Sequence, residues 1–118
     1  MSESMTDTEA LELIRTTMRD LENWRISFAF KRMKLKYMRE ATTNLMKACI
    51  AFHLYGLPVT TDLMGALLEI QGRSRLALSS RLHNLGDKHC LTLKRGRPRR
   101  HGAIHEWVVN PVFLEAYR

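Results

Sequence analysis

The spacing of apolar residues predicts a chain built mainly of helices. Over the first 40 residues, apolar side chains recur in steps of three and four, which places them on one helical face; they are Leu11, Ile14, Met18, Leu21, Trp24 and Phe28. Positions 6–55 contain neither proline nor glycine, so long helices are permitted there. We expect a first helix capped at its start by Asp7 or Thr8, and a second helix from about Arg25 to Glu40, with a break near Asn23.

The middle of the chain predicts two more helices. In the stretch TTNLMKACIAFHLYG the apolar stripe consists of Leu45, Ala48, Cys49 and Phe52. Gly56 follows this stripe and suits the left-handed end of a helix. Pro58 then requires extended backbone, and Thr60 or Thr61 is expected to cap a short helix. The apolar residues of that helix are Leu63, Leu67 and Leu68.

A turn, one more helix and two strands complete the predicted order of elements. Gly72 suits a tight turn, and Ser74 is expected to cap the next helix. The inner face of that helix carries Leu78, Leu82 and Leu85. Residues 90–94 and 103–109 have the pattern of strands on either side of a basic loop. Pro111 ends the second strand, and the tail VFLEAY is expected to fold back on the core. The expected class is mainly α with a small β-hairpin (α+β).

Composition and charge restrict the kind of partner. Hydrophobic residues make up 45% of the chain and charged residues 26%, which is typical of a folded domain and not of a disordered one. The net charge of +7 favours a polyanionic partner. Residues 1–22 carry two bases against six acids, whereas 23–40 carry six against one and 41–118 carry eleven against five. Acidic membranes and acidic proteins also attract basic surfaces, so charge alone defines only a class of partner.

The most basic segment lies between the two expected strands. Residues 95–101 include four arginines and no acid: Arg95, Arg97, Arg99 and Arg100. Cations this close together repel one another, and the whole stretch from Lys88 to Arg100 contains no acid. An anionic partner opposite the loop would compensate this repulsion. The alternative is a solvated run of charge.

The order of these elements resembles the winged helix-turn-helix family over about residues 41–110. The most specific part is SRLALSSRLHNLGDKHCLTL, which is similar to the recognition helix and first wing strand of bacterial winged-helix regulators. In that family a serine cap, a leucine pair three residues apart and a four-residue exit lead into an apolar strand. This chain fills those places with Ser74, Leu82, Leu85, residues 86–89 and residues 90–91. His89 replaces the usual exit glycine, so it must adopt a left-handed conformation or shift the turn.

The resemblance implies a recognition helix, at about 74–86, that enters the major groove of DNA. The DNA contacts expected from this helix are Arg73, Arg75, Leu76, Ser79, Ser80, His83 and Asn84. Serine, histidine and asparagine hydrogen-bond to base edges, arginine reads guanine, and Leu76 can meet a thymine methyl group. The alternative is a solvated helix face, with Leu76 in the core or in an interface.

The resemblance also assigns the basic loop, at about 95–102, to the wing, which in this family lies on phosphates or enters the adjacent minor groove. Its expected DNA contacts are Lys94, Arg95, Arg97, Arg99 and Arg100. RGRP, residues 95–98, is similar to the core of the AT-hook. There, glycine and proline keep the backbone flat while arginines enter a narrow A/T-rich groove. Phosphate contact and minor-groove insertion both remain open.

Residues 1–40 are interpreted as a helical arm added to a DNA-binding domain of residues 41–118. Its apolar row either packs on that domain or pairs two copies of the chain. Symmetric pairing would present two recognition helices to a palindromic site, and we expect a homodimer through these helices. The segment KRMKLKYMR, Lys31 to Arg39, either contacts flanking phosphates or forms a solvated helix face.

The sequence carries no recognisable enzyme motif: GxGxxG, GxxxxGK(S/T), HExxH and GxSxG are all missing. The candidate metal ligands are His89, Cys90, His101 and His105, but they lack the paired cysteines of a zinc finger. We expect no metal and no other cofactor. Cys49 and Cys90 are expected in the core. Few cysteines, an acidic start and no long apolar run favour a cytoplasmic, nucleoid-associated protein without a membrane partner.

Three functions remain open. The first is sequence-specific binding of double-stranded DNA by a homodimeric transcriptional regulator, expected to be a repressor that acts by occlusion. The second is an architectural or plasmid/phage maintenance protein that uses the same contacts. The third is a protein-interaction module whose basic face binds an acidic partner, since a fold alone does not determine function.

Overall fold

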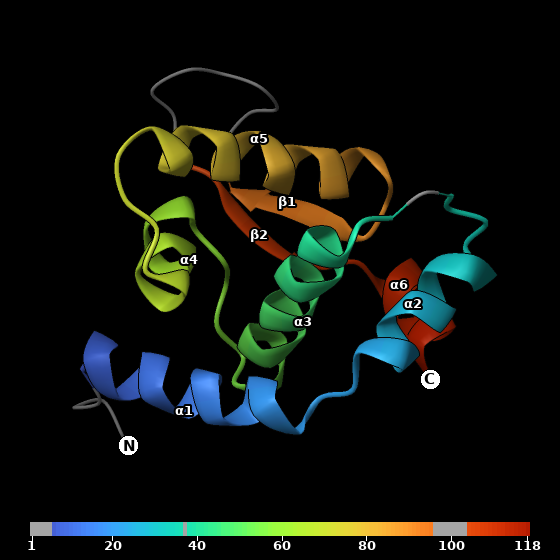
Figure 1. Ribbon diagram of the computed structural model, residues 1–118, viewed down its shortest axis with the longest axis horizontal. Coiled ribbons are helices and arrows are strands. Elements are labelled where there is room, and N and C mark those ends of the chain that lie inside the picture. Colours follow the sequence, from blue (N-terminus) through green and yellow to red (C-terminus); the bar gives the residue numbers. More distant parts are fainter. Residues whose placement is uncertain (1–5, 37, 96–103) are drawn as a thin grey trace.

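A central helix, α3, has other elements packed around it (Figure 1). The computed structural model describes residues 6–36, 38–95 and 104–118. In these residues the elements are α1 (Asp7–Asp20), α2 (Asn23–Arg32), α3 (Glu40–Leu54), α4 (Thr61–Leu68), α5 (Arg73–Asp87), β1 (Leu91–Arg95), β2 (Glu106–Val109) and α6 (Pro111–Tyr117). The predicted class, mainly helical with a small antiparallel sheet, is confirmed.

The cap of α1 is Thr6, not Asp7 or Thr8 as predicted. Thr6 Oγ1 accepts a hydrogen bond from the Glu9 amide at 3.2 Å, and Glu9 Oε1 accepts one from the Thr6 amide at 3.0 Å. This reciprocal pair is a capping box, in which a carboxylate three residues on selects the capping residue. Hydrogen bonds from the Thr6 amide and hydroxyl also hold the pKa of the Glu9 carboxyl below its usual range, because they favour the charged form.

The predicted apolar row of residues 11–28 is divided between two helices. α1 ends at Asp20, and Leu21 has extended backbone with φ −86° and ψ 138°. The helical phase therefore restarts in α2, whose buried residues are Ile26, Ala29 and Phe30. Trp24 is 62% exposed and Phe28 is 47% exposed. The expectation of one continuous apolar face is thus wrong for these two aromatic residues.

α2 ends at Arg32, whereas the sequence predicted a helix reaching about Glu40. Lys34 has left-handed backbone with φ 63°, and the Leu35 amide donates to the Phe30 carbonyl at 2.9 Å. This bond closes the helix as a Schellman motif. Glycine usually occupies the left-handed position of that motif. Because a lysine holds the left-handed position here, the sequence gives no warning of the break.

The helix predicted from TTNLMKACIAFHLYG is α3, and its predicted stripe is buried: Leu45, Ala48, Cys49 and Phe52. Gly56 has φ 67°, which confirms the predicted left-handed stop. Thr60 caps α4 as predicted, because its Oγ1 accepts a hydrogen bond from the Leu63 amide at 3.1 Å.

The start of α5 differs from the prediction, and its exit agrees with it. Ser74 does not cap the helix, because Arg73 is already helical and Gly72, with φ 66°, is the capping residue. Only a residue without a side chain adopts this backbone easily. At the exit, His89 has φ 63°, the left-handed conformation predicted there.

β1 and β2 form an antiparallel hairpin in which Leu93 lies opposite Trp107. β1 begins one residue later than predicted. Of the predicted second strand, Glu106–Val109 is a strand, and residue 103 lies outside the described residues. Val59, between α3 and α4, exchanges two 2.8 Å backbone hydrogen bonds with Trp107 from the other edge of β2. This one-residue bridge, which the sequence did not predict, ties the segment before α4 to the hairpin.

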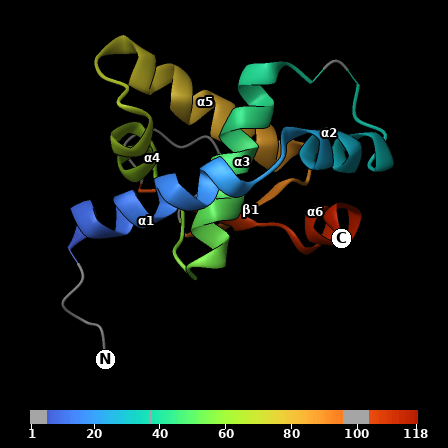
Figure 2. The same ribbon diagram turned by 60° about the horizontal axis from the view of Figure 1, so that its bottom comes forward.

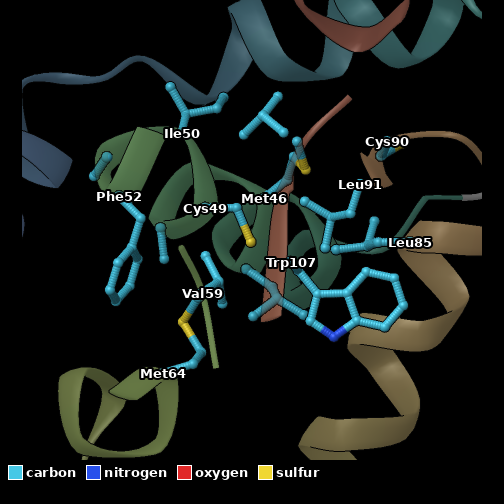
Figure 3. Close-up of a cluster of buried hydrophobic side chains, with 14 of the residues drawn as sticks. Met46, Cys49, Ile50, Phe52, Val59, Met64, Leu85, Cys90, Leu91 and Trp107 are labelled. Carbon is cyan, nitrogen blue, oxygen red and sulfur yellow. The ribbon is translucent and has the colours of Figure 1, made fainter. Parts of the chain in front are cut away.

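One hydrophobic core joins all parts of the described chain. Figure 3 shows Met46 and Cys49 of α3 in one cluster with Met64 of α4 and Trp107 of β2. Ile14 of α1 and Phe30 of α2 are buried in the same cluster, so the predicted arm and residues 41–118 share a core. Figure 2 shows α1 crossing α3 and α6 lying beside α2. Phe113 of α6 packs edge-on against Phe30 with ring centroids 5.8 Å apart, which confirms that the tail folds back. No helix in the described part of the chain is long and apolar enough to cross a membrane.

Candidate nucleic-acid interface

α4 and α5 are joined by residues 69–72 and pack against each other, and Arg75 of α5 lies over α4. Arg75 Nη1 lies 3.3 Å from Asp62 Oδ1, and the guanidinium covers Gly65 of α4 so closely that a Cβ there would lie 2.6 Å from Nε. Arg75 is a predicted DNA contact, yet it is half-buried between the two helices. Its side chain therefore lies against α4, and its ion pair contributes little because Asp62 is well solvated.

The face of α5 opposite its leucines is exposed and carries no acid before its last turn. The inward residues are buried as predicted: Leu78, Leu82 and Leu85. On the outer side Arg73, Ser80 and Asn84 are exposed, and Ser79 is half-buried. Leu76 is 72% exposed, which excludes the alternative that it belongs to the core of this chain. Short hydrogen-bonding side chains around an exposed methyl-rich one suit the edges of DNA bases.

The sequence predicted that His83 lies on the outer face of α5, and the structure corrects this. Its side chain is buried, with 8% exposed. The ring lies edge-on to Trp107 and to His105, with centroids 4.9 Å and 4.8 Å away. The reason is that β2 packs against this side of α5, so a position that the helical pattern turns outward is covered by the hairpin. His83 therefore supports the joint between α5 and the hairpin.

The strand ends that lead into the basic loop are exposed. Lys94 and Arg95 both lie on the surface at the end of β1. Arg95 Nη1 is 3.7 Å from Glu106 Oε2, a pair that contributes little because Arg95 is well solvated. Glu106 therefore offsets part of the charge of one of the four loop arginines. The other predicted contacts in the wing, Arg97, Arg99 and Arg100, lie outside the described residues.

Arg81 is a cation of α5 that the sequence did not single out. It is half-buried, and its Nη2 donates a hydrogen bond of 3.0 Å to the Ala41 carbonyl in the first turn of α3. No local signal points to this contact, because periodicity places Arg81 beside the leucines without saying which helix lies next to them. Lys88 follows at the end of α5 and is exposed.

Neither cysteine is exposed on this surface. Cys49 and Cys90 are buried, as predicted, and burial raises the pKa of both thiols, to about 12 for Cys90. In the described residues no group of three or more His, Cys, Asp or Glu side chains is placed to hold a metal ion. His101, one of the candidate ligands, lies outside those residues.

Comparison with protein-family models, with curated proteins and with solved structures finds no match. Any inference about the function of this chain therefore rests on its own residues and their geometry.

Proposed function

We propose that this chain is a winged helix-turn-helix protein that binds double-stranded DNA, without enzymatic activity, as a homodimeric transcriptional regulator. It would act on nucleoid DNA in the cytoplasm, most simply as a repressor by occlusion. The observation that carries the proposal is the exposed face of α5, which presents Arg73, Leu76 and Ser80 from a helix anchored on its other side.

The anchoring supports the use of α5 as a reading element. It packs against α4 and β1, its leucines are buried in the common core, and His83 packs on Trp107 of the hairpin. A rigid helix with short polar side chains on its free face can enter the major groove, where base edges are distinguishable. In this arrangement Arg73 and Ser80 contact bases.

The hairpin supports a second, sequence-independent contact. β1 ends with Lys94 and Arg95 on the surface, and the sequence continues into Arg97, Arg99 and Arg100. Arginines in such a wing neutralise phosphates, which strengthens binding to every duplex and makes it dependent on salt. Changing the four arginines to alanine should flatten the plot of log affinity against log salt by about 0.9 for each phosphate that is no longer neutralised. An unchanged affinity and slope would remove the wing from the interface.

The test of the function is selection of duplex DNA by the purified chain, followed by binding titrations on the selected and a scrambled duplex. Ser80→Ala should reduce discrimination between them by about 1–3 kcal/mol, the value of one hydrogen-bonded base contact. Ser27→Ala, on the exposed surface of α2, is the matched control and should leave discrimination unchanged. Equal losses on both duplexes would mean that α5 faces phosphates instead of bases.

The same titrations separate the two other functions. One short palindromic footprint supports a regulator, whereas long cooperative coverage of A/T-rich DNA supports an architectural or plasmid/phage maintenance protein. If the chain shifts no duplex even at low salt, the proposal fails, and the basic face is better explained as a binding surface for an acidic protein.

A further inference from the structure

We infer that a basic pocket between the start of α3 and the end of α5 binds a phosphate group, namely a backbone phosphate of the DNA beyond the recognition face. This inference rests on the proposed function. It adds Arg81 and Lys88 to the predicted contacts, and for Lys36 and Arg39 it favours phosphate contact over a solvated surface. Figure 1 shows the start of α3 close to the end of α5 that leads into β1.

The pocket has a volume of about 170 Å³ and four cationic side chains on its wall: Lys36, Arg39, Arg81 and Lys88. Two neutral polar side chains, Thr42 and Asn84, also line it, and among its described lining residues there is no acid. Its volume is well above the share of about 30 Å³ that one water occupies in the liquid, so a phosphate group can enter with part of its hydration shell.

The pocket combines an apolar floor with a charged rim. Leu45 and Leu85 are buried and line the inside, whereas Lys36 and Arg39 are exposed at the edge. A floor of buried leucines cannot solvate an anion, so binding depends on the cations and the polar groups around it. A pocket of this shape suits a group that is attached to a larger molecule on one side, such as a phosphate that projects from a DNA backbone.

The cations are brought together without anions to balance them. Arg39 and Lys36 have no ion-pair partner among the described residues. Arg81 is held at the pocket by its bond to the Ala41 carbonyl, which leaves its other guanidinium N–H groups available. Four positive charges around one hollow repel one another, and a phosphate placed between them removes that repulsion through charge-assisted hydrogen bonds.

Lys88 also has a local role, because it is the C-terminal cap of α5 and offsets the negative end of that helix. Arg81 supports the first turn of α3. The side chains of Lys36 and Arg39 have neither role. Lys36 lies between α2 and α3, and Arg39 accepts the first hydrogen bonds of α3 only through its backbone carbonyl, while its side chain makes no capping bond. These two residues are therefore the ones to change.

The experiment compares Lys36→Gln/Arg39→Gln with a control that removes the same charge elsewhere, Arg19→Gln/Arg118→Gln. Arg19 is exposed on α1, Arg118 is exposed directly after α6, and neither lines the pocket. Salt-dependent titrations with the selected and the scrambled duplex should show equal weakening on both for the pocket variant. Its log–log salt slope should be shallower by about 0.9 for one phosphate and about 1.8 if each residue contacts its own. The control should keep the slope of the unaltered chain.

A thermal melt of each variant checks that it is folded, and Lys88→Gln gives a second pocket variant if the pair is not. If the unaltered chain binds DNA and the pocket variants match the control, the pocket inference is wrong while the proposed function stands.

Pyrophosphate distinguishes DNA phosphate from a small phosphorylated ligand. If the unaltered chain binds no duplex, yet pyrophosphate raises its melting temperature and the pocket variant loses this rise, the pocket binds phosphate but its assignment to DNA fails with the proposed function. If neither duplex nor pyrophosphate binds, both proposals fail.

Discussion

Gly86 of α5 packs directly against the indole ring of Trp107 in β2. A Cβ at position 86 would lie 2.6 Å from Cζ3 and 3.0 Å from Cη2 of that ring. The indole is 4% exposed and is bordered by His83, so it has little room to move. This contact determines how closely α5 lies on the hairpin, and hence how its exposed face stands relative to Lys94 and Arg95.

Gly86→Ala is therefore expected to lower the free energy of unfolding by about 1–3 kcal/mol, the usual cost of overpacking a closed contact. This cost exceeds the gain of about 0.8–1 kcal/mol that alanine has over glycine inside a helix. Gly65→Ala is the control, because the atoms in its way are the end of the Arg75 side chain, which can swing aside. Urea denaturation of both variants checks this. If both variants lose the same free energy of unfolding, the ring of Trp107 moves aside as easily as the Arg75 side chain, and the prediction is wrong.

His83→Ala is expected to destabilise the fold and to leave DNA discrimination intact. Removal of the edge-on ring packing with Trp107 and His105 should cost about 1–3 kcal/mol. Denaturant titration gives the stability, and binding to selected and scrambled duplexes, measured where the variant is folded, gives the discrimination. Normal stability combined with reduced discrimination would mean that His83 turns outward to read a base.

The aromatic residues that α2 leaves exposed are expected to form the dimer contact. Light scattering of the intact chain should give twice the mass of one chain, and Trp24→Ser/Phe28→Ser should give the mass of one. Leu76→Ser, which removes an equally exposed apolar residue from α5, should leave the dimer intact. Deleting residues 1–40 is a poorer test, because Ile14 and Phe30 belong to the core. A monomeric intact chain would exclude the two-fold arrangement.

Cys49 and Cys90 are expected to resist thiol reagents at neutral pH in the folded chain and to react once it is unfolded. Burial raises the pKa of Cys90 from 9.0 to about 12, so the unfolded chain ionises this thiol first. The stability that this difference contributes is present below about pH 9 and is lost as the pH rises toward 12. Cys90→Ala should therefore show a flatter decline of stability in that range. Rapid labelling of the native protein would contradict the burial of both thiols.

The features that the sequence predicted correctly depend on residues that are close together along the chain. The leucines at 78, 82 and 85, the left-handed Gly56 and His89, and the cap at Thr60 all follow from helical periodicity or from backbone stereochemistry. The wrong predictions for the end of α2 and for the start of α5 have local causes too. Lys34 takes a left-handed position normally marked by glycine, and Gly72 pre-empts Ser74 as the cap. In the first case no glycine marks the break, and in the second a glycine and a serine compete for one role that a pattern cannot assign.

The candidate site could be predicted only where its residues lie on one helix. The exposed face with Arg73, Leu76 and Ser80 follows from the leucines on the other side of α5. The pocket could not be predicted, since Lys36 and Arg39 meet Arg81 and Lys88 only because the start of α3 packs beside the end of α5.

The sequence by itself determined the class of fold, the order of the elements as far as β2, the inner face of α5 and the excess of positive charge; that the tail is a helix, α6, was not predicted. Periodicity, caps and composition act over a few residues, so they can be read along the chain. Only the tertiary structure decided that His83 is covered, that Arg75 lies against α4, and that Trp24 and Phe28 face outward. Each of these depends on which element packs against which face, and contacts between residues distant along the chain make that choice.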